Sequence, residues 1–132
     1  MQMKLELVPI PVSDVDRAKA FYADKVGFHV DHDVNPGNGM RVVQLTPPGS
    51  ACSIVIGTGM GDIDKMTPGS IKAIHLVVKD VRQAAAELAS RGVECGPVDE
   101  HPQGMKYVSF SDPDGNLWLF QEIPWRSAEF ES

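Results

Sequence analysis

One short pattern occurs twice in this sequence, 66 residues apart, and this repeat constrains the fold more than any other feature. Val12–Val15 reads VSDV and Val78–Val81 reads VKDV, and the same spacing relates Ala18 to Ala84. Because 66 residues are half of the 132-residue chain, the two halves correspond to one another. A repeat of this length indicates two copies of one supersecondary unit.

Each half begins with a strand signal followed by a helix signal. Leu5–Val12 and Ile74–Val78 are apolar enough for strands. Asp14 and Asp80 then stand where helix N-caps are expected, and apolar residues recur behind them at three- and four-residue spacing. Each predicted helix therefore has one buried face and ends where a glycine interrupts the pattern. The two terminating glycines are Gly27 and Gly92.

Three more strand candidates, separated by turn residues, follow each helix. Those of the first half are Phe28–Val34, Met40–Leu45 and Cys52–Ile56. Those of the second half are Val93–Val98, Lys106–Phe110 and Leu117–Ile123. The sequence thus predicts an α+β fold, a single domain over 1–132 built from two tandem βαβββ modules. The predicted boundaries are module one 1–57, a linker 58–69, module two 70–124 and a tail 125–132.

Composition and charge exclude some partners. A formal net charge of -6 gives a surface that repels phosphate backbones, so no nucleic-acid partner is expected. No apolar run reaches the roughly 18 residues of a membrane span, and the first residues do not read as a signal peptide. We therefore expect a cytoplasmic protein with no membrane partner. Cys52 and Cys95 fit no Cys-x-x-Cys or zinc-ligand spacing and are expected to stay reduced.

Two segments carry a resemblance to a known family. Pro11–Ala18 (PVSDVDRA) is followed by Phe21 and Tyr22, and Phe110–Asn116 (FSDPDGN) leads into the last strand. With the duplication, this pattern resembles the vicinal oxygen chelate superfamily, which includes glyoxalase I, extradiol dioxygenases, and fosfomycin- and bleomycin-resistance proteins. The resemblance covers nearly the whole chain. It implies that the two modules form a curved mixed sheet around a small-molecule cavity.

Enzymes of that family usually hold one divalent metal on the first and last strands of each module. Where the family places His or Gln, seven residues before each capping Asp, this chain has Leu7 and Ala73. Where the family places Glu or His in the last strands, it has Ser53 and Leu119. Divalent metals prefer imidazole, carboxylate or thiolate ligands. The sequence therefore predicts no metal site and no cofactor.

A different strand register changes the prediction about the metal site only in part. A shift of two residues keeps the same strand face, because side chains alternate along a strand. The four positions then hold Pro9, His75, Val55 and Gln121. Two potential ligands do not make a tight metal site, but a divalent metal at non-standard positions remains the alternative if the register is misread.

The residues expected to contact a ligand follow from the face that the resemblance turns into the cavity. His75 and Gln121 are the main polar candidates on that face, with Gln44 and Ser53 as further polar lining. Trp118 could stack on a planar ligand at the end of the last strand. His75 is also the candidate general acid or base. The alternative for His75 is a core histidine hydrogen-bonded to a backbone carbonyl.

Three functions compete on these observations. The first is a metal-free binding module for an apolar or aromatic small molecule, as in bleomycin-resistance proteins, and such proteins lead us to expect a homodimer. The second is an isomerase, lyase or cyclase that works without metal through His75 or with a non-standard metal site. The third is a regulatory or scaffold domain whose cavity is filled by side chains.

Overall fold

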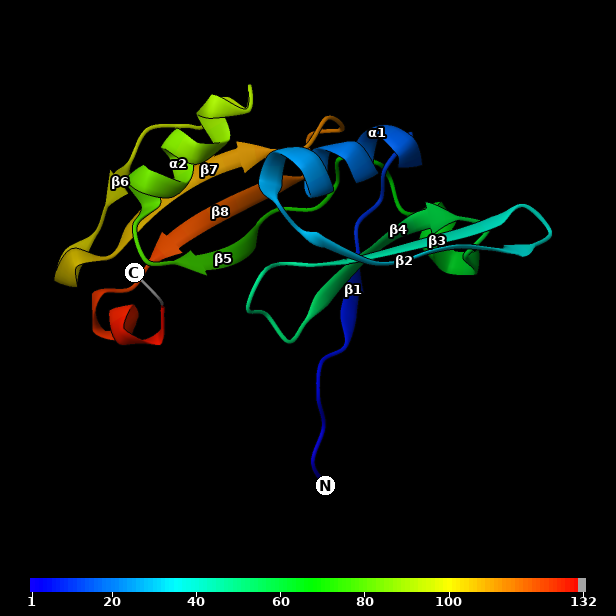
Figure 1. Cartoon of the computed structure of the whole chain (residues 1–132), viewed down its shortest axis with the longest axis horizontal. Helices are drawn as coiled ribbons and strands as arrows, with labels where there is room; N and C mark the ends of the chain where they lie inside the picture. Colours follow the sequence, from blue (N-terminus) through cyan, green and yellow to red (C-terminus); the bar gives the residue numbers. More distant parts are fainter. Residues whose placement is uncertain (131–132) are drawn as a thin grey trace. The chain divides into compact units, whose positions relative to one another are not determined.

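The computed structural model describes residues 1–130 and forms two compact units (Figure 1). The first unit comprises Met1–Ile71 together with Asp112–Asn116. The second comprises Lys72–Ser111 and the chain from Leu117 onward. No helix within residues 1–130 has the length and apolar character that crossing a membrane requires.

The first unit is a four-stranded mixed sheet with a helix on one face. Its strands are β1 (Leu7–Pro9), β2 (His29–Gly37), β3 (Met40–Thr46) and β4 (Ser53–Thr58). They lie in the order β1-β4-β3-β2, with β1 parallel to β4 and the other pairs antiparallel. The helix α1 (Val15–Ala20) contacts β4. This is the βαβββ order predicted for module one.

The ends of the first helix are set by the predicted residues. Asp14 is the N-cap, and its side chain accepts a 3.0 Å hydrogen bond from the backbone N–H of Arg17. After α1 the chain continues as a π-helix, η1 (Phe21–Val26), which the sequence pattern does not reveal. Gly27 then ends the helical segment with a φ of 97°, a left-handed conformation that glycine adopts without steric penalty.

The turn 112–116 packs within the first unit through buried hydrogen bonds. Asp112 is 5% exposed and its Oδ2 accepts from the hydroxyl of Tyr22 at 2.7 Å and from Nδ2 of Asn116 at 2.8 Å. Asn116 also donates to the carbonyl of Pro11 at 2.8 Å. Asp114 accepts from the hydroxyl of Ser13 at 2.6 Å. The DPDGN motif is therefore a structural turn whose polar groups are satisfied inside the protein.

An ion network joins α1 to strands β2 and β3. Arg41 binds the carboxylate of Asp33 with two nitrogens, at 3.1 and 3.0 Å, and Lys19 binds the same carboxylate at 2.7 Å. Another nitrogen of Arg41 lies 2.6 Å from Oδ1 of Asp16. The hydrogen bonds from Arg41 and then Lys19 hold the pKa of Asp33 well below its ordinary value.

The second unit repeats the architecture of the first. Its elements are β5 (Ile74–Val78), α2 (Val81–Ser90), β6 (Asp99–Glu100), β7 (Lys106–Ser111) and β8 (Leu117–Glu122). The strand order β5-β8-β7-β6 matches that of the first sheet, and β5 is parallel to β8. The α+β fold of two tandem βαβββ modules is thereby confirmed.

Helix α2 begins and ends as predicted. The side chain of Asp80 accepts from the backbone N–H groups of Arg82 and Gln83 at 2.9 and 3.1 Å. Oε1 of Glu122 accepts from the N–H of Val81 at 3.0 Å, so a carboxylate of the last strand binds the start of the helix. Gly92 ends the helical turn with a φ of 84°.

One predicted strand, Val93–Val98, is wrong. In this part of the chain only Asp99 and Glu100 pair with β7, while Gly96 makes one 2.8 Å bond from its N–H to the carbonyl of Ser109. Pro97 has no N–H to donate to a ladder. A Cβ on Gly96 would lie 2.6 Å from Oγ of Ser109, so the glycine allows the segment to pass close to β7.

The predicted linker and tail contain short 3-10 helices. These are η2 (Gly61–Lys65) in the linker and η4 (Pro124–Glu129), which extends into the tail after β8. A third short 3-10 helix, η3 (Pro102–Gly104), lies between β6 and β7 in module two. Glu131 and Ser132 of the tail lie outside the described residues. Cys52 and Cys95 are free thiols, and burial raises the pKa of the Cys95 thiol.

Candidate ligand-binding site

The second sheet has one covered face and one open face. Val108 and Phe110 on β7 and Trp118 and Phe120 on β8 are buried, and helix α2 contacts both strands. Because side chains alternate along a strand, the residues between them point to the other face. On that face Tyr107 is opposite Gln121, and Ser109 is opposite Leu119, which in turn is opposite His75 on β5.

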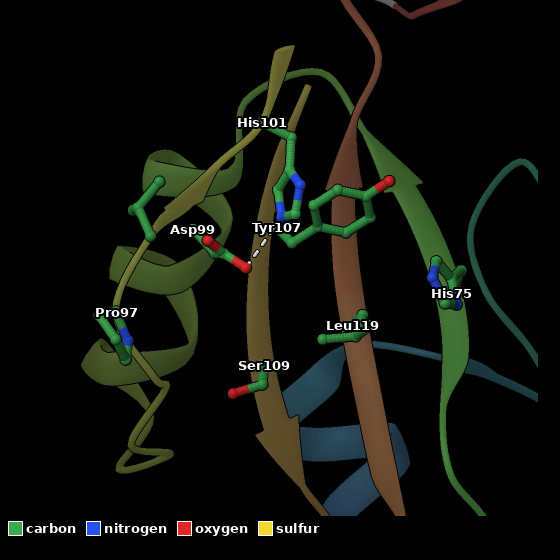
Figure 2. A pocket seen from close by; sticks show the side chains of 8 residues that line it. His75, Pro97, Asp99, His101, Tyr107, Ser109 and Leu119 are labelled. Carbon is green, nitrogen blue, oxygen red and sulfur yellow. Dashed lines mark hydrogen bonds and ion pairs between the residues drawn. The ribbon is translucent and has the colours of Figure 1, made fainter. Parts of the chain in front are cut away.

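A pocket of about 580 Å³ lies on this open face (Figure 2). Strand residues that line it are His75, Tyr107, Ser109 and Leu119. The segment leading into and out of β6 supplies the other wall with Pro97, Val98, Asp99 and His101. All eight residues belong to the second unit. The volume is that of a typical small-molecule site, and the lining combines apolar side chains with a few polar groups, as in ligand-binding sites generally.

Tyr107 is the central aromatic residue of the pocket. Its ring meets the imidazole of His101 edge to face, with the centroids 5.0 Å apart, and that of His75 in the same manner at 6.0 Å. Nε2 of His101 lies 2.9 Å from Oδ2 of Asp99. Figure 2 shows Tyr107 extending over the sheet with His101 beside it and His75 on the edge strand β5, on the far side of β8. Three aromatic rings thus line the pocket.

The hydroxyl of Tyr107 is oriented by a neighbouring amide. Nε2 of Gln121 donates to this hydroxyl at 3.1 Å. The amide nitrogen can only donate, so the phenol oxygen accepts through a lone pair and its O–H is not used in this bond. Within residues 1–130 no group accepts that proton. The arrangement therefore presents a hydrogen-bond donor at the pocket.

Comparison with known proteins decides the family. The family model of the Glyoxalase/Bleomycin resistance protein/Dioxygenase superfamily matches residues 4–120. The chain belongs to this superfamily.

Solved structures from this superfamily share the fold. The crystal structure of TnmS3, an antibiotic binding protein from Streptomyces sp. CB03234, is 35% identical, with 92% of this chain and 96% of that chain covered and a TM-score of 0.79. A superfamily member from Sphaerobacter thermophilus is 32% identical, with 92% and 98% covered and a TM-score of 0.81. The uncharacterized protein YetH of Bacillus subtilis is 26% identical over 92% of this chain and all of that protein.

In neither sheet do the residues at the superfamily's metal-ligand positions supply the donor set that a divalent metal needs. Leu7 is opposite Ser53 in the first sheet, whereas Leu119 is opposite His75, not Ala73, in the second. The pairing of β5 with β8 is therefore shifted by two residues from the pairing that the 66-residue repeat and the register of β1 with β4 predict. Even so, His75 is the one strong metal ligand at these four paired positions. Within residues 1–130, no three His, Cys, Asp or Glu side chains gather closely enough to hold a metal ion.

The candidate residues from the sequence lie in different environments. His75 is exposed, lines the pocket, and its Nδ1 lies 3.2 Å from the carbonyl of Ala73. Gln121 is half-buried and contacts Tyr107. Trp118 is 1% exposed and stacks on Phe110, with the ring centroids 6.0 Å apart, so it lies on the covered face of the sheet.

The other two candidates belong to the first unit. Gln44 on β3 donates to the carboxylate of Glu6 at 3.1 Å. Ser53 on β4 is buried, and its hydroxyl lies 2.6 Å from that of Thr46. Neither residue lines the pocket of the second unit. Their role as polar lining of a ligand cavity stays a prediction.

The sequence reasoning missed Tyr107, the residue at the centre of the pocket. A signal for it existed, because the antiparallel pairing of the last two strands puts Tyr107 on the face of Gln121 and Leu119. The same alternation sends Trp118 to the opposite face. The contact of His101 with Asp99 and Tyr107 depends on the short β6, which the sequence did not reveal.

Proposed function

We propose that the chain binds a small planar aromatic molecule in the pocket of the second unit. The observation that carries this proposal is Tyr107 on an open sheet face, whose ring contacts the imidazoles of His75 and His101 and whose hydroxyl accepts from Gln121. Aromatic side chains give a flat ligand large contact area at little entropic cost. The antibiotic binding protein TnmS3, at 35% identity, supports a binding role of this kind.

The apolar lining gives the ligand its contact area. Pro97 and Val98 lie on one wall, and Leu119 lies on the sheet between Ser109 and His75. A bicyclic aromatic ring fits the volume of about 580 Å³ with room for a substituent. Burial of such a ring supplies the main part of the binding free energy.

The polar group at the pocket selects the substituent. Since the bond from Gln121 does not use the Tyr107 O–H, this group donates to an acceptor on the ligand. A carbonyl oxygen attached to the aromatic ring is such an acceptor, whereas an alkyl group of the same size leaves the hydroxyl unpaired. We therefore expect the pocket to prefer an aromatic carbonyl compound to the hydrocarbon analogue of the same size.

The proposed binding needs no divalent metal, because the paired positions in the two sheets hold Leu7, Ser53 and Leu119 with a single histidine. We also propose that the protein is a homodimer. The pocket is lined entirely by the second unit of a single chain, so saturation is expected at one ligand per chain.

A second candidate function is proton transfer by His75. Its Nδ1 faces the Ala73 carbonyl, which can only accept, so this nitrogen carries the proton in the neutral imidazole. Nε2 is then the basic nitrogen, on a residue that lines the pocket. If a bound carbonyl compound is consumed during incubation and His75→Gln abolishes the consumption, this second function replaces simple binding.

Isothermal titration calorimetry with 1-acetonaphthone tests the binding proposal. Its control, 1-ethylnaphthalene, has the same ring and nearly the same size but no carbonyl. We expect saturable binding of both compounds, at least tenfold tighter for 1-acetonaphthone, and a higher melting temperature with each. No binding of either compound would contradict the proposed function and favour the scaffold alternative. Equal affinities would contradict only the role of the carbonyl.

A further inference from the structure

The first residues of the chain expose apolar side chains in a regular order. Met1 is 106%, Met3 80% and Leu5 68% exposed, and they are three of the five large apolar side chains exposed within residues 1–130. Figure 1 shows this segment extending outward from β1. Isolated exposed apolar residues are ordinary, but three at two-residue spacing on one extended segment are not.

The pattern is that of a half-buried strand. The polar residues Gln2, Lys4 and Glu6 alternate with the apolar ones, and Leu7 continues the apolar series into β1. Within residues 1–130, the backbone of residues 1–5 makes no hydrogen bond. β1 is itself the edge strand of its sheet, paired only with β4. An extended edge of this kind presents unpaired N–H and C=O groups to another strand.

We propose that residues 1–9 pair antiparallel with the same segment of a second copy of this chain, around a two-fold axis at Leu5. Met3 then lies opposite Leu7 of the second copy, and Leu5 lies opposite itself. Met1, Met3, Leu5 and Leu7 then fall on one face of the paired strands. The contact joins two first-unit sheets at the β1 edge.

The charges of the segment select this register. With the axis at Leu5, Lys4 lies opposite Glu6 of the second copy, and symmetry makes two such pairs. An axis at Lys4 or at Glu6 puts like charges directly opposite one another, which destabilises a strand pair. Glu6 accepts from Gln44 through Oε2, and within residues 1–130 its other oxygen accepts no hydrogen bond. That oxygen is available to the lysine.

The proposed strand pairing joins two chains and does not involve the ligand pocket. Binding of 1-acetonaphthone by a monomeric variant keeps its failure separate from a failure of the proposed function, because the pocket residues belong to the second unit.

Sedimentation equilibrium of the full chain tests the proposal, with any purification tag removed. We expect a dimer whose Kd rises about a hundredfold in Leu5→Asp, because the leucine is buried only in the dimer. Lys4→Glu and Glu6→Lys alone are each expected to raise Kd about tenfold, and the double variant K4E/E6K to return it to within about threefold of the unmodified chain. Lys79→Glu, the same charge change at an exposed residue of the second unit, is the control.

Several outcomes would overturn the proposal. A monomeric unmodified chain would do so, as would a dimer that Leu5→Asp weakens no more than Lys79→Glu does. A double variant K4E/E6K no better than its parents would overturn the register. Thermal melts by circular dichroism at low protein concentration exclude unfolding as the cause, since Leu5 contributes little buried area within one chain.

Discussion

The hydroxyl of Tyr22 donates a 2.7 Å hydrogen bond to Oδ2 of Asp112, and both residues are buried. Asp112 also accepts from the N–H groups of Asp114 and Asn116, so the bond completes a fully satisfied buried carboxylate. Tyr22 packs its ring on Phe28 with the centroids 5.6 Å apart. The ring and the hydroxyl of Tyr22 thus make separable contributions to stability.

Tyr22→Phe keeps the ring packing and removes the bond to Asp112. We expect a loss of about 1–2 kcal/mol in the free energy of unfolding, measured by urea denaturation. Asp112→Ala, which removes the acceptor for several buried donors, is expected to cost about 3 kcal/mol or more. Tyr107→Phe is the matched control and should change stability by less than about 0.5 kcal/mol. Equal effects of the two tyrosine changes would contradict this account.

Asp33 makes the stability depend on acid pH. Its pKa is lower in the folded protein than the ordinary value of 3.8, so its contribution is complete above that value and is lost as the pH falls below it. Asp33→Asn is therefore expected to cost about 1–2 kcal/mol near neutral pH, after allowance for partial exposure, and progressively less at more acid pH. Urea denaturation of both proteins over an acid pH series measures the difference. A difference that stays constant below the ordinary Asp pKa would refute the assignment.

Tyr107→Phe separates the hydroxyl from the ring in ligand binding. We expect the affinity for 1-acetonaphthone to fall about tenfold, because the donor to the carbonyl is lost, while that for 1-ethylnaphthalene changes by less than about twofold. Tyr107→Ala should weaken both compounds, because the ring itself is removed. Calorimetric titration of the two variants checks this. Phe110→Leu, a change on the covered face, serves as the control and should leave the preference for the carbonyl compound intact.

Metal analysis tests the donor set of the two sheets. Purified protein, incubated in turn with Mn, Fe, Co, Ni and Zn and then desalted, is expected to retain no metal above the buffer background by elemental mass spectrometry. The physical reason is that, of the four paired positions, only His75 is a strong metal ligand, whereas Leu7, Ser53 and Leu119 are not. One metal per chain or per dimer, lost in His75→Ala, would contradict the prediction.

The fold was largely predictable because local signals and the repeat agree. Asp14 and Asp80 cap their helices through side-chain oxygens, and Gly27 and Gly92 end them with positive φ. The strand expected at Val93–Val98 fails because backbone pairing depends on N–H groups as well as on apolar side chains, and Pro97 lacks one. The π-helix after α1 has no sequence signal distinct from that of an α-helix.

The site was less predictable, because it depends on which strands pair and in what register. His75 and Gln121 were predicted from the family resemblance together with strand alternation, and both contact Tyr107. Tyr107 follows from the same rule only when the pairing of β7 with β8 is known. The contact between His101 and Asp99 arises from the path of the chain around β6, for which the sequence offers no periodic signal.

Because β6 is short, the pocket wall beside it can change during evolution. Pro97 and Val98 form a wall of the pocket, but the segment they occupy is tied to the sheet by a single bond at Gly96 and the two-residue ladder that follows. Insertions and substitutions there remove few ladder hydrogen bonds, so they reshape the binding site at a small cost in folding free energy. Mutation can therefore vary the molecule that is bound while selection keeps the sheet unchanged.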